Sequence, residues 1–504
     1  MHQDSFSGRY VIKLSSSIVI AAINAIIQLL LPRALSVETY GMYSYNLNIF
    51  TSVVILANLS TSNAMVSKLA QRNKERGIIY FYLQFFFIIS VILNIFVIGL
   101  YVAGDISRFF KGQTIYLVLL GLNAAVLNKL LSDVISMYDA MAISRFPAIL
   151  QVMLKVIMCI CISAGYFIGT LNLYVFYLLQ SIITFIIIGI LICALLKEHK
   201  NRYREEHNYN YKKYLIEFYH FCQPLILASC WAQLMIIIMN WILMNYAGKS
   251  EQAMYGVALQ INVVIGYVFS PYAELLKREF AVIEDNEVKI QYKLYQSLQH
   301  MYWLAAYFSI YIFLCADWIV PFLFGDDYIG AITPTRIIMI YTLYQAWGQV
   351  GGSFLLATER TKRQALFTSI SQTLILLCVL IFQIPNIFFP KGLGAEGIAL
   401  NYMVSNFLST VILISYCINV SKIRYRAMIG IQVQTLFICI VASCIGKLAA
   451  IIFASNLVGS IGVIMKILIS GTIYTVIIMM ILWIFPEMIG LTRERITEKL
   501  RRNK

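Results

Sequence analysis

The feature that most constrains this chain is a series of long apolar runs that recurs along nearly its whole length. A helix of about 20 apolar residues crosses the ~30 Å hydrocarbon core of a bilayer. The runs are continuously apolar, without the alternation that is typical of a transmembrane β-barrel strand. They cover residues 10–31, 42–66, 78–103, 114–137, 146–168, 172–196, 215–246, 253–278, 299–324, 331–357, 363–385, 395–420, 427–453 and 459–485.

The composition leads to the same fold class. Of the 504 residues, 60% are hydrophobic and 12% are charged, whereas soluble domains carry about 25% charged residues. A water-soluble fold could not bury this much apolar surface, so lipid has to be part of the solvent. We therefore predict an all-α integral membrane protein with about fourteen transmembrane helices.

The distribution of basic residues predicts the orientation of the chain. Most of the 39 lysines and arginines lie in the N-terminal segment, the even-numbered connections and the C-terminal tail. Cytoplasmic loops carry such an excess, so both termini are expected on the cytoplasmic side. The net charge of +15 follows mainly from this bias, and nucleic-acid binding is not expected. The odd-numbered connections carry Arg33, Arg108, Lys111, Lys249 and Lys391.

Several classes of function lack their sequence signals. The chain has no GxxxxGK[ST] phosphate loop, no HExxH motif and no GxSxG motif. Its ten cysteines lie in apolar runs without a CxxC pair, so we interpret them as packing residues and expect no metal. We predict that the protein is not an enzyme and binds no cofactor. Transport would then draw on a gradient, such as one of protons or sodium ions.

Two pairs of similar segments suggest an internal repeat. SVETYG (36–41) resembles SEQAMYG (250–256), and ISRFPAIL (143–150) matches TKRQALF (361–367) at nearly the same spacing. A chance recurrence of an interfacial tyrosine and a turn glycine is the alternative for the first pair. The repeat predicts two pseudo-symmetric six-helix bundles related by an axis along the membrane normal, with substrate bound between them. We place the halves at 1–196 and 215–420, joined by a basic cytoplasmic linker at 197–214 and followed by two further helices and a basic tail at 421–504.

Charged residues deep inside the apolar runs are the leading candidates for function. A charge at the bilayer centre costs ~2.5–3.5 kcal/mol, so its presence requires a reason. Lys129, Lys155 and Lys466 each lie about two turns inside and bias the interior toward positive charge, which suits an anionic group such as phosphate. Arg336 follows Pro334 at the outer start of its segment and is a further candidate, with an interfacial position as the alternative. Asp133 lies one helical turn from Lys129 and is the candidate for ion coupling. A structural cluster in which Asp133 neutralises Lys129 is an equally open interpretation.

Polar amides also recur where a lipid-facing helix should be apolar. They fall on the helices that the repeat relates to one another and suit the wall of a polar cavity between the halves. Hydrogen bonding between helices explains them nearly as well. The predicted cavity-lining residues are Asn24, Gln28, Asn58, Asn63, Gln233 and Gln260.

The opening of the chain resembles a known family. Residues 29–77 read LLLPRALSVETYGMYSYNLNIFTSVVILANLSTSNAMVSKLAQRNKERG: an Arg-x-Leu-Ser turn, an acidic residue, an aromatic–glycine pair, a second helix and a basic connection. This order, with YDAMAISRFPAI at 138–149, is similar to the oligosaccharide flippases of the polysaccharide transporter family (Wzx-type), within the superfamily that includes multidrug and toxin extrusion (MATE) transporters. The resemblance in helix number and halves covers nearly the whole chain.

The resemblance implies a function in the assembly of cell-envelope glycans. Such proteins move an undecaprenyl-pyrophosphate-linked oligosaccharide, such as an O-antigen or capsule repeat unit, across the bacterial inner membrane through a cationic cavity. The machinery that polymerises the glycan is then an expected partner. Arg33 occupies the family's arginine position after the first helix and is a candidate for binding the head group, whereas Lys129, Lys155 and Arg336 are chosen from charge and depth alone.

Other functions stay open on the sequence alone. A MATE-like multidrug or cation antiporter has the same architecture, but its cationic drugs would favour a deep carboxylate in the first helix, which is absent here. A lipid II flippase has a similar layout. A membrane glycan polymerase or ligase would normally need a large outer loop, and the longest connections here are predicted to be cytoplasmic.

Overall fold

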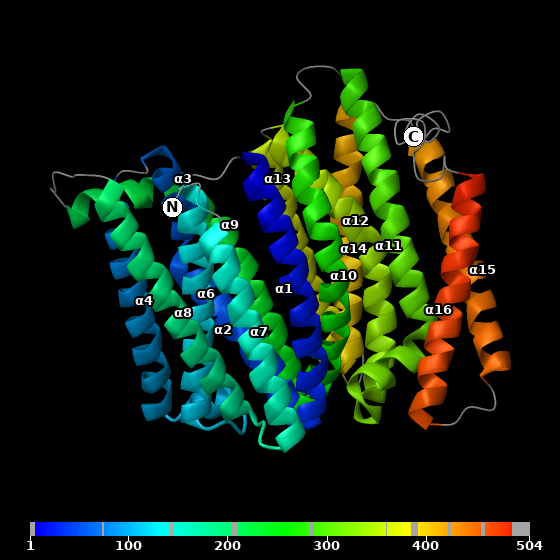
Figure 1. Ribbon diagram of the computed structural model, residues 1–504, viewed down its shortest axis with the longest axis horizontal. Helices are drawn as coiled ribbons and strands as arrows, with labels where there is room; N and C mark the ends of the chain where they lie inside the picture. Colours follow the sequence, from blue (N-terminus) through cyan, green and yellow to red (C-terminus); the bar gives the residue numbers. More distant parts are fainter. Residues whose placement is uncertain are drawn as a thin grey trace. The chain divides into compact units, whose positions relative to one another are not determined.

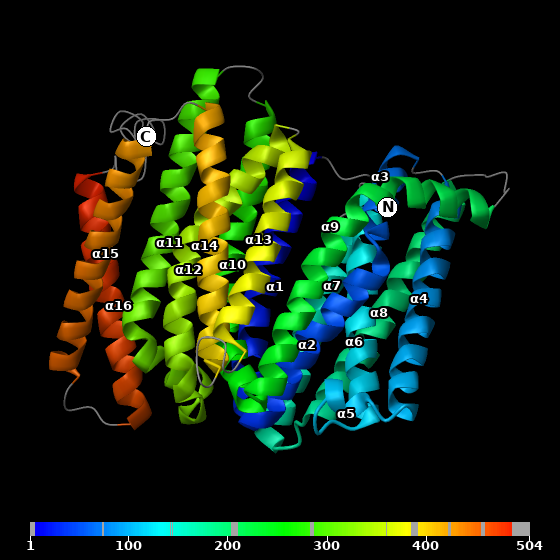
Figure 2. The same ribbon diagram turned by 180° about the vertical axis from the view of Figure 1, so that it is seen from behind.

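The computed structural model describes residues 6–72, 75–141, 143, 145–202, 210–282, 287–358, 360–384, 392–421, 425–454 and 459–485, and within these ranges the protein is all-α. Figures 1 and 2 show the helices from opposite sides. The first 253 residues contain α1 (Phe6–Ala34), α2 (Val37–Asn58), α3 (Thr61–Gln71), α4 (Arg76–Val102), α5 (Ile106–Phe109), α6 (Ile115–Ala140), α7 (Arg145–Ile168), α8 (Leu173–Arg202), α9 (Tyr211–Tyr246) and the start of α10 (Lys249–Val282). The rest contains α11 (Glu287–Phe324), the 3₁₀ helix η1 (Asp326–Ala331), α12 (Ile332–Ala357), α13 (Thr361–Phe382), α14 (Gly394–Ser421), α15 (Tyr425–Phe453) and α16 (Gly459–Ile484).

Each predicted apolar segment coincides with one of these helices except 42–66, which is divided between α2 and α3, and this confirms an all-α, multi-pass membrane protein. Among the described residues, 11 helices are long and apolar enough to cross a membrane, or 12 if the bent pair α2 and α3 is counted as one span. The helices α9 and α12 match the two remaining predicted segments but are not among these 12. The chain end after 485, the linker residues 203–209 and Lys391 lie outside the described residues.

The helices pack into two compact units, residues 1–253 and 254–504. In the first unit α1 packs on α7, α6 on α8, and α2 on both α6 and α9. In the second unit α12 packs between α11 and α14, while α15 and α16 pack on each other and on α11. Because α9 contacts α2, it belongs by packing to the first unit, whereas the repeat places it in the second half. The packing units do not test the predicted halves, which were defined by the sequence repeat and stay a prediction.

The outer surfaces of the units are apolar, as lipid contact requires. Large side chains such as Phe167, Phe96, Leu227 and Trp483 are exposed on the helices. A soluble monomer rarely exposes contiguous apolar patches of this extent. The helices themselves approach closely through small residues: a Cβ placed at Gly446 of α15 would meet the backbone carbonyl of Ser470 in α16. Small residues at such crossings are typical of membrane helix packing.

The predicted segment at 42–66 is not the single helix that the sequence indicates. The sequence indicates one continuous helix over 42–66, but the structure breaks it into α2 and α3, which are bent by 53°. Leu59 and Ser60 both adopt left-handed backbone conformations, with φ of 50° and 62°. Neither is a glycine, and the sequence carries no proline there, so the two strongest breaker residues are missing at the bend.

Candidate functional site

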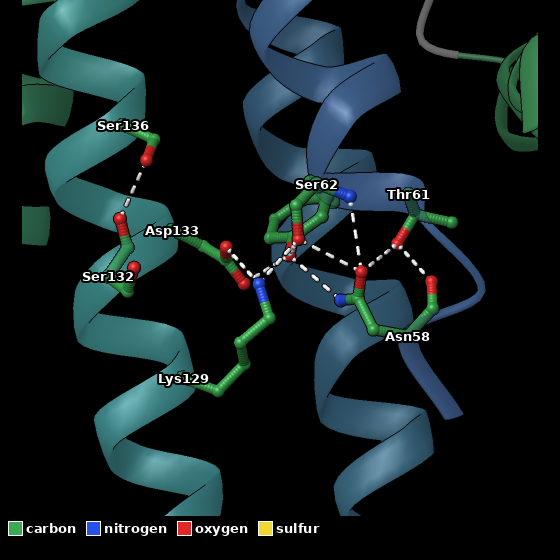
Figure 3. A network of polar contacts seen from close by, with 8 residues as sticks. Asn58, Thr61, Ser62, Lys129, Ser132, Asp133 and Ser136 are labelled. Carbon is green, nitrogen blue, oxygen red and sulfur yellow. Dashed lines mark hydrogen bonds and ion pairs between the residues drawn. The ribbon is translucent and has the colours of Figure 1, made fainter. Parts of the chain in front are cut away.

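The strongest cluster of buried polar side chains in the first unit lies at this bend. Figure 3 shows Lys129 and Asp133 reaching from α6 toward the residues that join α2 to α3. The Lys129 ammonium donates to Asp133 Oδ1 at 2.5 Å and to Ser62 Oγ at 2.7 Å. The Tyr82 hydroxyl of α4 donates to Asp133 Oδ2 at 2.5 Å. Both carboxylate oxygens are therefore bonded, and Asp133 is fully buried.

Asn58 connects this ion pair to the bend itself. Its amide nitrogen donates to the Tyr82 hydroxyl at 3.0 Å. Its amide oxygen accepts from the Ser62 backbone N–H at 3.1 Å and from the Ser62 hydroxyl at 2.9 Å. Thr61 Oγ1 donates to the Asn58 carbonyl oxygen at 2.7 Å. The side chains of Asn58 and Thr61 thus satisfy backbone groups that the broken helix would leave open, while the Ser62 hydroxyl connects the bend to Lys129 of α6.

The network changes how two predicted residues are interpreted. Lys129 and Asp133 are brought together as a direct ion pair, as the structural interpretation expects. Lys129 nevertheless keeps partial exposure, with 21% of its side chain accessible against 3% for Asp133. A ligand could therefore contact the Lys129 side chain, but in this conformation its charge is neutralised by Asp133.

Lys155 has a different environment. It lies inside the span of α7 and is half-buried, and no described acidic side chain forms an ion pair with it. One turn earlier, Gln151 lines a cavity of about 270 Å³ in the first unit. Hydroxyl, amide and carboxylate groups from α1, α6 and α7 line this cavity: Ser16, Ser17, Ser132, Ser136, Asp139 and Gln151, with Ile135, Pro147 and Ala148. A sugar hydroxyl or a phosphate can be hydrogen-bonded by such a wall.

A second cavity in the same unit has the opposite character. Its volume is about 400 Å³, and its wall is almost wholly apolar. The indole N–H of Trp241 is buried there without a hydrogen-bond partner among the described residues. Such a cavity can hold a hydrocarbon chain but offers nothing to a phosphate. Its lining is Tyr45, Ile49, Phe50, Val53, Leu93, Phe96, Val97, Leu100, Phe109, Phe110, Leu122, Ile237, Ile238 and Trp241.

The remaining predicted cations have other partners or surroundings. Arg33 is exposed in the last turn of α1, where a positive charge complements the helix dipole. Arg336 belongs to the second unit, where its guanidinium lies 3.7 Å from Asp317 and donates to the Phe313 carbonyl oxygen at 3.2 Å. Their joint role with Lys129 and Lys155 in one site stays a prediction.

The predicted cavity-lining amides fall into three environments. Asn58 is part of the buried network, whereas Asn63 is exposed on α3. Gln28 and Gln260 each bury an amide oxygen that has no partner among the described residues, which leaves them able to accept from a ligand or water. Asn24 and Gln233 are half-buried on α1 and α9.

Other amides hold helices together, as the alternative interpretation expects. Asn46 and Gln113 exchange two hydrogen bonds, at 2.8 and 3.1 Å. Asn240 accepts from Asn48 and from Gln252, each at 3.0 Å. Such bonds are worth about 0.6 kcal/mol each on average in membrane proteins. Interhelical hydrogen bonding therefore explains these side chains without a ligand.

Ion pairs also tie α3 to the first turns of α9. The Glu217 carboxylate is 2.8 Å from Lys68 and 2.5 Å from Arg72. Arg72 also pairs with Glu75 at 3.2 Å, and Glu75 accepts from the Tyr214 hydroxyl at 2.5 Å. The segment that follows the bend is thus fixed at both ends, by the Asn58 network and by these pairs.

Sequence reasoning missed Tyr82, Thr61 and Ser62. A tyrosine in an apolar helix reads as an interfacial or core residue, and nothing in the sequence indicates which side chain from another helix it meets. One signal was available: Asn58, Thr61 and Ser62 form a polar group within a few residues of one another in the middle of an apolar segment. Such a group is typical of a helix end.

No protein-family model matches the chain, and no curated protein matches it in sequence. Solved structures do match. The lipid II flippase MurJ in an inward closed conformation is similar over 94% of this chain and 98% of MurJ, with 13% identity and a TM-score of 0.68. An inward-facing MATE multidrug resistance transporter of the MOP superfamily is similar over 84% of this chain and 99% of its own, with 13% identity and a TM-score of 0.61.

A structure of the MATE multidrug transporter DinF-BH is also similar, at 14% identity over 81% of this chain and 93% of its own, with a TM-score of 0.56. At identities this low, the similarity concerns the fold alone. It does not show whether the chain belongs with the oligosaccharide flippases that its opening resembles or with another group of proteins that has this fold. The chain accordingly has the fold that MurJ and the MATE transporters of the MOP superfamily share.

Proposed function

We propose that this protein is a flippase that moves an undecaprenyl-pyrophosphate-linked oligosaccharide across the bacterial inner membrane by alternating access. The observation that carries the proposal is the similarity over nearly the full length of both this chain and MurJ. A shared fold supports a shared transport cycle, in which two halves expose a site to each side in turn. The chain would cross the membrane about fourteen times, with both termini in the cytoplasm.

Within this proposal Lys155 and Lys129 bind the pyrophosphate. Lys155 is a cation inside a span without a described ion-pair partner, one helical turn after Gln151, which lines a polar cavity. A buried charge of this kind is costly and is retained for a ligand, a relay or a partner. The polar walls of the 270 Å³ cavity suit the hydroxyls of a sugar. Arg33 remains a candidate for the head group on the family resemblance.

Asp133 supplies the coupling in this account. It competes with the substrate phosphate for Lys129, since the same ammonium cannot be fully neutralised by both. A proton or sodium ion on Asp133 would shift this competition toward phosphate binding, and loss of the ion would return Lys129 to Asp133 and favour release. Tyr82 holds the other carboxylate oxygen and orients Asp133 throughout.

Lipid II is the second candidate substrate, because the MurJ structure is the one similar over the largest share of this chain among those described above. A MATE-like multidrug or cation antiporter fits the fold as well. The charges in the first unit favour an anionic substrate. Its deep cations are Lys129 and Lys155, and the carboxylate among them, Asp133, is already paired with Lys129. A cationic drug would instead need a deep acidic residue without a partner.

The test is the leaflet distribution of lipid-linked oligosaccharide in cells that lack this gene. We expect accumulation in the cytoplasmic leaflet, and rescue by the wild-type protein and by Lys155→Arg, which keeps the charge. Lys155→Gln should fail, whereas Lys111→Gln, which removes a charge from a predicted outer loop, should rescue. Rescue by Lys155→Gln would dismiss the cation, and an unchanged distribution would contradict the flippase.

The same cells separate the alternatives. Accumulation of lipid II instead of the oligosaccharide would assign lipid II as the substrate. A change in susceptibility to cationic drugs, with both lipids distributed normally, would assign a drug antiporter.

A further inference from the structure

The second unit contains a cluster of cations that the proposed transport cycle does not use. Asp317 and Trp318 of α11 lie at its centre, and Arg336, Lys447 and Lys466 approach them from α12, α15 and α16. We call these five residues the outer cation cluster. Two of its helices, α15 and α16, lie outside the predicted repeat, and the other two, α11 and α12, belong to the predicted second half.

Within the cluster, Lys447 and Asp317 form the fixed pair. The Lys447 ammonium lies 2.8 and 3.0 Å from the two Asp317 oxygens and donates to the Leu314 carbonyl oxygen at 2.6 Å. Its three donors are therefore occupied. The Asp317 charge is largely neutralised by this contact, and Arg336 is left at the longer distance of 3.7 Å.

The remaining positive charge is not balanced. Lys466 lies 6.0 Å from the centre of the Trp318 ring, and no ion pair joins it to a carboxylate among the residues that the structure describes. The cluster thus holds three cations and one carboxylate, and that carboxylate pairs with Lys447 and Arg336. A cation–π contact is worth about 0.5–1 kcal/mol at exposed sites, which does not replace a counter-ion. The cluster carries an excess of positive charge and requires an anion.

The cluster lies at one depth and close to lipid. Asp317 and Lys447 are about two turns before the ends of α11 and α15, and Lys466 is about two turns after the start of α16. The basic-residue distribution predicts that this end faces outward. Neighbouring side chains of α15 and α16, including Leu448, Ile452 and Leu468, are exposed and apolar. Lysine and arginine at such depth reach the head groups of the bilayer.

We propose that the outer cation cluster binds the phosphate of an anionic lipid from the outer leaflet, with Arg336 and Lys466 as its direct ligands. Lys447 and Asp317 fix the floor of the site, and the apolar faces of α15 and α16 contact the acyl chains. The inference is independent of the transported substrate. Phosphate from solution shares the chemistry, but the exposed apolar faces beside the cluster favour a lipid.

The experiment measures the thermal unfolding of the full-length protein in nanodiscs. Phosphatidylcholine discs, in which the phosphate is balanced by choline, are compared with discs that contain increasing fractions of phosphatidylglycerol. We expect phosphatidylglycerol to raise the Tm by a few degrees, because a ligand that binds the folded state stabilises it. Lys466→Gln and Arg336→Gln should each weaken the apparent affinity about fivefold.

The control is Arg108→Gln, which removes one charge from a predicted outer loop where Arg108 is paired with Asp105. It should keep the wild-type dependence on phosphatidylglycerol. Asp317→Asn should lower the Tm yet bind the lipid more tightly, whereas a purely structural cluster would give lower stability without tighter binding. If Arg336→Gln does not fold, Lys466→Gln decides, since Lys466 has no carboxylate partner among the described residues.

Three results would overturn the proposal: no dependence of the Tm on phosphatidylglycerol, an equal loss of affinity in Arg108→Gln, or a full Tm shift produced by glycerol phosphate in phosphatidylcholine discs. The last would assign the site to a soluble phosphate instead of a lipid.

Discussion

Lys129 and Asp133 depend on each other for stabilisation of their charges. Each partner satisfies the other inside a transmembrane helix, with Tyr82 and Ser62 completing the hydrogen bonds. Removing one partner of a buried pair leaves an uncompensated charge and costs about 3–5 kcal/mol, whereas replacing both is often nearly neutral. The pair therefore allows its structural and transport roles to be separated.

We predict that Lys129→Met lowers the free energy of unfolding by about 3 kcal/mol and that Lys129→Met with Asp133→Asn recovers most of this loss. Denaturant or thermal unfolding in detergent measures both. The double variant should still fail to move lipid-linked oligosaccharide, since no cation remains at the bend. A double variant that is stable and transports normally would limit the pair to a structural role.

Gly41 shows why the Tyr-Gly pair is needed at the start of α2. A Cβ at this position would overlap the backbone carbonyl of Lys249, where α10 begins and where the second copy of the motif is found. The close approach accounts for glycine without any unusual backbone conformation.

We expect Gly41→Ala to cost about 1–3 kcal/mol, because the atom it meets belongs to the backbone and cannot rotate away. Gly189→Ala in α8 is the matched control, since a Cβ there meets nothing within 4 Å. The control should be neutral or stabilising by about 0.5–1 kcal/mol. Thermal unfolding of the two variants decides, and equal effects would refute the packing explanation.

At the level of elements, the bend between α2 and α3 requires backbone conformations that its residues, Leu59 and Ser60, disfavour. Two successive non-glycine residues in the left-handed region cost roughly 1–2 kcal/mol each. The Asn58 network and the Glu217 ion pairs stabilise the bent form from its two sides. Strain that persists under such constraints is typical of a segment that moves during function.

Leu59→Gly should raise the stability of the bent form by about 1 kcal/mol, because glycine adopts a positive φ without strain. Leu56→Gly, three residues earlier inside α2, should instead lower it by about 1 kcal/mol. Unfolding curves of the two variants measure the difference. If both variants lose stability equally, the strain assigned to Leu59 is absent.

The positions of the helices could be predicted from the sequence because a continuous run of about 20 apolar residues has one stable form in a bilayer. The bend could not, since the side chains that hold Asn58 and Ser62 in place, Tyr82 and Lys129, come from α4 and α6. The helical extensions of α11 and α9 beyond the predicted segments were missed for a similar reason: their polar ends interrupt the hydropathy pattern without interrupting the helix.

For the whole molecule, the distribution of basic residues predicts the orientation. In a protein with its ten cysteines replaced, Arg108→Cys should react with a membrane-impermeant maleimide added to intact cells. Lys212→Cys, at the start of α9, should react only after the cells are opened. Both positions are exposed in the structure, so access is not limited by burial. The reverse pattern would invert the topology and place the outer cation cluster in the cytoplasm.

The candidate site was predicted in part. Charge and depth identify Lys129, Lys155 and Asp133, because an ionisable residue in a span is rare enough to require an explanation. Their partners depend on how helices distant in the sequence are rotated, and hydropathy does not determine rotation. Arg336 illustrates this: its sequence position gave no indication that Asp317 of α11 would be its ion-pair partner.

Transbilayer movement of the native substrate is the most direct test of the central claim. Lipid-linked oligosaccharide isolated from cells that lack the gene is placed in both leaflets of vesicles with the purified protein, and an impermeant periodate reagent oxidises the exposed glycan. With a proton or sodium gradient, the wild-type protein should expose clearly more than the roughly half that faces outward in protein-free vesicles, and Lys155→Gln should not. An oxidised fraction that stays at about half under either gradient would contradict the flippase.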